Sequence, residues 1–220
     1  MTHLGNLVGD YAHLFGNIDP LLITLDKEYK SKEIYPSKKD VFKAFRHCPY
    51  SELKVVVVGM DPYSQRGYAT GIAFANPIGT NPVSPSLELL RERIRKDFYL
   101  ENPADFNFDI TLESWAKQGI LLINSALTVV AGHTGSHGRL WYPVLKDFFT
   151  NLSSYNTGIV YLLLGTQAQQ FLPFIDSKNN YVLCYKHPAY YARINMEFKC
   201  DGFIKAQEIV KRNNNYLLKF

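Results

Sequence analysis

The chain has 220 residues, and its 24 lysines and arginines against 20 aspartates and glutamates give a formal net charge of +4. A composition with 46% hydrophobic and 20% charged residues supports an extensive core and excludes an intrinsically disordered chain. The three cysteines, Cys48, Cys184 and Cys200, are too few and too scattered for a disulfide framework, and no CxxC pair indicates a zinc site. The positive charge is compatible with a polyanionic partner but is too small to imply one.

The amino terminus lacks a basic segment followed by a long apolar stretch, and nowhere do about 18 apolar residues run together. Neither a secretory signal nor a transmembrane helix is therefore expected. We expect a soluble intracellular protein, cytoplasmic in general and nuclear in a eukaryotic or viral setting, which functions as a monomer and binds no membrane.

Four apolar runs of strand length occur along the chain, at residues 53–58, 119–124, 158–164 and 181–185. Their hydrophobicity is nearly continuous, which is typical of strands buried on both faces of a parallel sheet covered by helices. Helices are predicted around these runs, at residues 40–47, from Ser84 through Ile94, and at 111–117, 141–152, 166–174 and 201–212. Strands alternating with helices predict one α/β/α sandwich domain spanning residues 1–220, in which about the first 40 residues allow but do not require a helical collar.

Polar side chains follow the predicted strands at the points where they end. Asp61 comes just after the first run, Asn124 ends the second, and His187 follows the fourth. Ligands of open parallel sheets bind beyond the carboxyl ends of the strands, so an acid, an amide and an imidazole are expected to converge there. Each residue alone is better explained by an ordinary turn or strand end, but the three together predict an active site.

Other chemistries lack their motifs. The sequence contains no GxGxxG fingerprint, no phosphate-binding P-loop and no GxSxG elbow, so neither a nucleotide cofactor nor a serine nucleophile is expected. His133 and His137 have the spacing of a metal-binding pair, but the glycines at 132, 135 and 138 argue against a helix there. We therefore expect no metal and no cofactor.

A series of short motifs resembles, in the correct order, the motifs of the family 1 uracil-DNA glycosylases. The matches run from about residue 40 to residue 211 and are GMDPYS at 59–64 for GQDPYH, GIAF at 71–74 for a GLSF-like segment, SPSL at 84–87 for PPSL, residues 115–128 for WAxQGVLLLNxxLT, residues 135–141 for SHxxxGW, residues 164–168 for LWGxxAQ, and His187-Pro188 for the start of HPSPLS. Each motif is short, but their combination and order are specific.

The resemblance implies the uracil-DNA glycosylase fold, an α/β/α sandwich with a central four-stranded, mainly parallel sheet. It also implies an enzyme that flips uracil out of DNA and hydrolyses its N-glycosidic bond, which initiates base excision repair. The expected partner is uracil-containing DNA, single- or double-stranded. A protein inhibitor or a replication factor stays open as a further partner.

The same resemblance assigns roles to individual residues. Asp61 would stabilise the cationic sugar and orient the attacking water, and His187 would donate a hydrogen bond to uracil O2 as a neutral imidazole. Uracil itself would be bound by the backbone of Met60, the C5-blocking ring of Tyr63, the stacking ring of Phe74 and the amide of Asn124. The DNA backbone and base stack would be contacted by Ser84, Ser86, Ser136, His137, Thr166, Tyr191 and Arg193.

The sequence departs from the family pattern most strongly after His187. Ala189, Tyr191 and Ala192 stand where the family has a serine, the inserted leucine and a second serine. The departure favours a preference for single-stranded DNA. It also leaves two alternatives open: a non-catalytic DNA- or partner-binding module of the same fold, such as a replication accessory subunit, and a glycosylase for another damaged pyrimidine.

Overall fold

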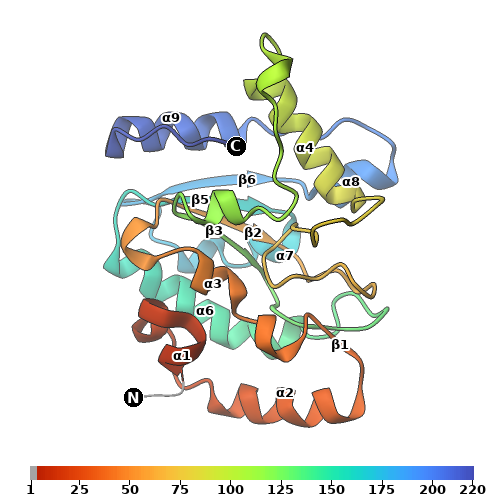
Figure 1. Ribbon diagram of the computed structural model, residues 1–220. Helices are drawn as coiled ribbons and strands as arrows, with labels where there is room; N and C mark the ends of the chain where they lie inside the picture. The colour runs from red at the N-terminus through yellow and green to blue at the C-terminus, as the bar shows by residue number, and fades with distance from the viewer. Residues whose placement is uncertain (1–3) are drawn as a thin grey trace.

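The structure is a computed structural model that describes residues 4–220, so residues 1–3 of the predicted domain lie outside the described part (Figure 1). Its α-helices are α1 (Leu4–Val8), α2 (Asp19–Ser31), α3 (Lys43–His47), α4 (Pro85–Phe98), α5 (Glu113–Ala116), α6 (Gly138–Tyr155), α7 (Thr166–Gln169), α8 (Pro188–Arg193) and α9 (Gly202–Asn214). The strands are β1 (Ile34–Tyr35), β2 (Val55–Gly59), β3 (Ile120–Asn124), β4 (Val129–Val130), β5 (Val160–Leu164) and β6 (Tyr181–Tyr185). Short 3₁₀ turns, η1 (Gly9–Leu14), η2 (Lys38–Asp40), η3 (Tyr50–Glu52), η4 (Pro103–Asp105) and η5 (Leu172–Phe174), connect several of them.

Four of the strands form one parallel sheet in the order β3-β2-β5-β6. Every residue of β2, β3 and β5 is buried, as their unbroken apolar sequences predict. The edge strand β6 is only partly covered, and Cys184 on it is exposed. The predicted four strands and the predicted fold class are confirmed.

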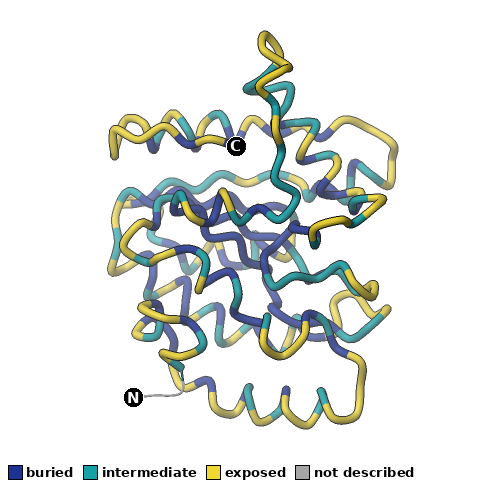
Figure 2. Tube along the Cα trace, viewed as in Figure 1, coloured by how far each residue is buried: buried dark blue, intermediate teal, exposed yellow. Residues whose placement is uncertain are grey.

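Helices cover both faces of this sheet. In Figure 1, α9 and α4 lie on one side of the sheet, and α3 and α6 lie on the other. Figure 2 shows the buried residues gathered in the sheet and on the helix faces turned toward it. On α6 the buried residues recur every three or four positions, which gives the helix one apolar face of Trp141, Leu145, Phe148, Phe149 and Leu152. Burying each such side chain stabilises the fold by about 1.5–3 kcal/mol.

Some elements were left open by the sequence or differ from what it predicts. Residues 4–40 include the helices α1 and α2, which the sequence allows, and β1 pairs with β4 in a small antiparallel sheet that no sequence pattern predicts. The predicted helix 166–174 is divided into α7 and η5, because Pro173 has no N–H to donate to the Gln169 carbonyl. The segment after His187, where no helix is predicted, is the helix α8, which has a proline at its first position and a capping histidine before it.

The helices of residues 4–220 include none with both the length and the apolar character that crossing a lipid bilayer requires.

Candidate active site

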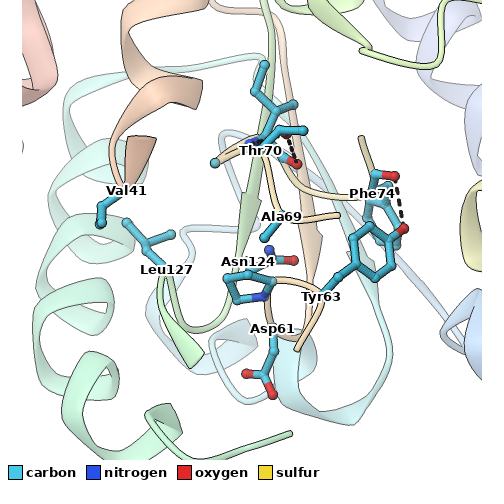
Figure 3. Close-up of a pocket in the computed structure, with 11 residues that line it drawn as sticks. Val41, Asp61, Tyr63, Ala69, Thr70, Phe74, Asn124 and Leu127 are labelled. Atoms are coloured by element: carbon cyan, nitrogen blue, oxygen red, sulfur yellow. Dashed lines mark hydrogen bonds between the residues drawn. The ribbon is translucent and has the colours of Figure 1, made fainter. Parts of the chain in front are cut away.

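The ends of β2 and β3 build one side of a cavity. Gly59 and Asn124 are register partners in the parallel ladder, and Asp61 lies two residues beyond Gly59. The cavity is lined by Asp61, Pro62, Tyr63, Phe74, Asn124 and Leu127, together with Val41 and residues 69–72 (Figure 3). The cavity therefore brings together three of the four predicted uracil-binding residues and one predicted catalytic residue.

His187 is not among the residues that line this cavity, but it packs against Phe74, which is. The two ring planes are tilted by 31°, with their centroids 5.4 Å apart. The Nδ1 atom of His187 accepts a hydrogen bond of 3.1 Å from the Ala189 amide, which can only donate. A neutral His187 ring must therefore carry its proton on Nε2.

Burial, aided by the positive charge of Arg193, lowers the pKa of His187 from 6.5 to about 4. The imidazole is thus neutral at pH 7. It keeps a hydrogen-bond donor without a positive charge, which matches the form predicted for this residue.

Asp61 is held by the loop that precedes α6. One of its carboxylate oxygens accepts a hydrogen bond from the backbone N–H of Gly135. Gly135 has a φ of 83°, a left-handed conformation that glycine adopts at no steric cost. Burial raises the pKa of Asp61, while the Gly135 N–H favours the charged carboxylate and offsets part of that shift.

Two glycines make room for the site residues, and the sequence analysis assigns neither of them a role. A Cβ on Gly59 would lie 2.5 Å from Asn124 Oδ1 and 3.0 Å from the ring of Phe74. A Cβ on Gly165, where φ is +94°, would lie 2.9 Å from the Cβ of His187. Both glycines belong to quoted motifs, and the position of each at a strand end is the signal that would have identified it.

Tyr63 and Met60 are both fixed by main-chain contacts. The Tyr63 hydroxyl donates a hydrogen bond of 2.9 Å to the carbonyl of Phe74, drawn as a dashed line in Figure 3. Burial raises the pKa of Tyr63 to about 12, so its hydroxyl keeps its proton at neutral pH. The carbonyl of Met60 accepts hydrogen bonds from the Ser125 hydroxyl and the Ala126 amide, which tie the turn after β2 to the turn after β3.

The seven predicted DNA contacts divide into two groups. Ser136, Thr166 and Arg193 are exposed, whereas Ser84, Ser86, His137 and Tyr191 are buried. Only the exposed three present their side chains to solvent on this structure.

His137 and Tyr191 are buried for identifiable reasons. The Nδ1 atom of His137 lies 2.7 Å from Thr128 Oγ1, and its Nε2 atom lies 2.7 Å from a carboxylate oxygen of Glu28. Both ring nitrogens lie against buried protein groups, and neither is available to a phosphate. Tyr191 packs edge-on against Phe198 with ring centroids 5.6 Å apart, so its ring points into the protein rather than toward a base stack.

Metal chemistry has no ligand set in the described part of the chain. Residues 4–220 contain no group of three or more histidine, cysteine, aspartate or glutamate side chains placed to hold a metal ion.

A family model of the Uracil DNA glycosylase superfamily matches residues 45–211. The chain belongs to this superfamily. The predicted family is thereby confirmed, and with it the enzyme class, a glycosylase that hydrolyses the N-glycosidic bond of uracil in DNA.

Relatives and solved structures agree with this membership. The uracil-DNA glycosylase of Fusobacterium nucleatum is 36% identical over 189 residues, covering 86% of this chain and 81% of that protein. The uracil-DNA glycosylase of Photorhabdus laumondii is 34% identical over 198 residues, covering 89% and 85%. The crystal structure of mimivirus uracil-DNA glycosylase shares the fold with a TM-score of 0.83 at 24% identity, covering 99% of this chain and 88% of that chain.

A mimivirus UNG variant in complex with UGI matches with a TM-score of 0.80 at 25% identity, covering 90% of this chain and 80% of that chain. For the chain described in this structure, the monomeric state and the binding of an inhibitor or a replication factor stay predictions.

Because Asn124 and Phe74 both lie close to Gly59, a substitution at Gly59 tests the geometry of the site. We expect Gly59→Ala to lower the rate of uracil excision by about 100-fold, because displacing a positioning group by about 1 Å has costs of that order. The measurement is abasic-site formation in a uracil-containing oligonucleotide. Gly5→Ala is the matched control, since a Cβ there meets nothing within 4 Å. Equal activity of the Gly59 variant and the wild type would contradict the assigned geometry.

The lowered pKa of His187 predicts a dependence of stability on pH. Between the unfolded value of 6.5 and the folded value of about 4, only the unfolded state gains a proton. The contribution of His187 to stability is therefore complete above pH 6.5 and is lost as the pH falls toward 4, by about 3 kcal/mol in total. Urea unfolding of wild type and His187→Gln across this range measures it, since the other histidines are common to both proteins. Parallel stability curves would show that His187 titrates normally.

Proposed function

We propose that this chain excises uracil from DNA with Asp61 and His187 as its catalytic residues. The observation that carries the proposal is the state of His187, a neutral imidazole whose Nδ1 is occupied by the Ala189 amide and whose ring adjoins Phe74 at the cavity. Such a ring offers one hydrogen-bond donor, Nε2–H, to a bound base.

The reaction separates charge within the site. The bond between the sugar C1′ and uracil N1 breaks with its electron pair going to uracil, while the sugar acquires cationic character. In the proposal, the carboxylate of Asp61 stabilises the sugar, orients a water molecule toward C1′ and accepts its proton. His187 donates through Nε2–H to uracil O2 as negative charge develops there.

Recognition of the base is assigned to the rest of the cavity lining. The Asn124 amide offers an acceptor for uracil N3–H and a donor for O4, a pattern that cytosine cannot satisfy. Phe74 would stack on the flipped base, the Met60 backbone would bind it, and the Tyr63 ring would occupy the space beside C5 and exclude a methyl group. Burial of Asn124 to 9% exposure supports its part, because hydrogen bonds from a buried amide to a bound base are stronger than they would be in water.

The DNA backbone is assigned to the exposed candidates Ser136, Thr166 and Arg193. They come from the loop before α6, the start of α7 and the end of α8. Contacts of this kind position a strand without reading its sequence. The proposal assigns no phosphate contact to the buried candidates Ser84, Ser86, His137 and Tyr191.

Substitution of the two catalytic residues tests the mechanism. We expect Asp61→Asn and His187→Gln each to lower single-turnover uracil excision by about 100- to 1,000-fold, as the loss of one preorganised group does in other enzymes. Circular dichroism spectra and unfolding midpoints serve as the folding controls. A folded Asp61→Asn variant with wild-type rates would reject Asp61 as the carboxylate that carries the reaction, and no excision by the wild type would favour a binding module.

Tyr191 and its neighbours predict a preference for single strands. Its ring is 8% exposed, and Ala189 and Ala192 lack hydroxyls, so the α8 segment offers less help in opening a duplex. Because flipping a base from a duplex costs a few kcal/mol, we expect excision from single strands to be at least about tenfold faster. Matched oligonucleotides with and without the complementary strand measure the ratio. Equal or faster excision from duplex DNA would reject the preference.

A further inference from the structure

The hydroxyl of Tyr63 is held at two points. It donates its proton to the carbonyl oxygen of Phe74 at 2.9 Å and accepts a second hydrogen bond of 2.6 Å from Ser84 Oγ. A phenol has one proton, so once the Phe74 carbonyl has received it, the second contact must be donated by Ser84. The ring of Tyr63 is thereby tied to the base-stacking residue on one side and to the start of α4 on the other.

Ser84 uses its hydroxyl in an unusual way for its position. It is the N-cap residue of α4, where a serine normally accepts a hydrogen bond from an amide of the first turn, yet its side chain makes no capping bond. The hydroxyl is directed to Tyr63 instead. With an exposed fraction of 3%, Ser84 is also closed to a DNA phosphate.

The main chain of Ser84 is anchored as well. Its amide donates a hydrogen bond of 2.7 Å to Oδ1 of Asn76, a fully buried side chain. The amide group of Asn76 is oriented in turn by a bond of 3.1 Å from its Nδ2 to the carbonyl of Ala75, directly after Phe74. Ser84 therefore presents its hydroxyl to Tyr63 from a fixed position.

We propose that Ser84 is a positioning residue that fixes the ring of Tyr63 and so determines how strictly the site rejects pyrimidines with a substituent at C5. The inference rests on the proposed role of Tyr63 beside uracil C5. Tyr63 lines the cavity together with Phe74 and Asn124, so a rotation of its ring changes the space next to the base. Without Ser84, the phenol keeps one anchor, the Phe74 carbonyl, and gains freedom to yield to a larger substituent.

The experiment compares excision of uracil with that of 5-fluorouracil, 5-bromouracil and thymine from otherwise identical single-stranded oligonucleotides. We expect Ser84→Ala to raise the ratio of thymine or 5-bromouracil excision to uracil excision by about threefold to tenfold, which is the equilibrium equivalent of one hydrogen bond. The increase should grow with the size of the substituent. Because the ratio is taken within each variant, a general loss of activity does not affect it.

Three further variants separate positioning from a structural role. Ser84→Thr keeps the hydroxyl and is expected to restore the wild-type ratio. Tyr63→Phe removes the phenol hydroxyl, and with it both the hydrogen bond from Ser84 and the one to the Phe74 carbonyl, so adding Ser84→Ala to it should raise the ratio no further. Tyr68→Phe is the matched control, since Tyr68 donates a hydrogen bond of 3.1 Å to Pro82 in the same segment but makes none to Tyr63. It should leave the ratio unchanged.

Each outcome decides the proposal. A wild-type ratio in Ser84→Ala, with a raised ratio in Tyr63→Ala, would show that Ser84 does not position Tyr63 while the role of Tyr63 stands. An unchanged ratio in Tyr63→Ala as well would overturn both. Equal losses on all substrates would make Ser84 a purely structural residue and overturn the proposal. If Ser84→Ala does not fold, the ratio in Ser84→Gly decides, because glycine is accepted at an N-cap and likewise lacks the hydroxyl. A raised ratio supports the hydrogen bond as the determinant, and an unchanged one rejects it.

Discussion

The parallel pairing of β2 with β3 is the constraint on which the site depends. Its register sets Gly59 beside Asn124, and the hydrogen bonds from Ser125 and Ala126 to the turn after β2 extend this pairing beyond the sheet. The chain can then leave both strands at the same edge, which gives the cavity an acid from one turn and an amide from the other. Because Gly59 has no side chain, Asn124 and Phe74 can both approach the end of β2. The shape of the cavity therefore depends on this register and on a glycine at this position.

Burial shifts the pKa values of the two proposed catalytic groups in opposite directions. Removing water disfavours charge, which raises the pKa of the Asp61 carboxyl and lowers that of the His187 imidazole. The backbone then treats them differently. The Gly135 N–H donates to the carboxylate and so supports its charge, whereas the Ala189 N–H donates to His187 Nδ1 and fixes the tautomer without adding charge to the ring. One low-polarity site can thus hold an anion and a neutral donor, the pair that cleavage to a cationic sugar and an anionic base requires.

The sheet and part of the cavity lining can be predicted from the sequence because both follow from local patterns. Continuous apolar runs identify β2, β3 and β5, and their ends identify Asp61 and Asn124. The antiparallel pair of β1 and β4 could not be predicted, because each strand has only two residues, too few for a periodic pattern of hydrophobicity. The burial of His137 could not be read locally either, since its partner Glu28 lies 109 positions earlier in the chain. For Ser84, the N-cap rule correctly located a helix start, but the competing partner Tyr63 is brought to it only by the tertiary fold.

The contact between His137 and Glu28 connects the site to a helix outside residues 45–211, the part of the chain that matches the superfamily model. Glu28 belongs to α2 and contacts His137, whose Nδ1 lies next to Thr128 Oγ1. His137 ends the loop before α6, and the Gly135 amide of the same loop donates a hydrogen bond to Asp61. Trp141 completes this arrangement by donating from its indole N–H to Thr128 Oγ1, the atom that lies 2.7 Å from His137 Nδ1. These contacts are buried, and they connect α2 to the loop before α6. An amino-terminal helix that lines no part of the cavity is thereby linked to the loop whose Gly135 amide holds the Asp61 carboxylate.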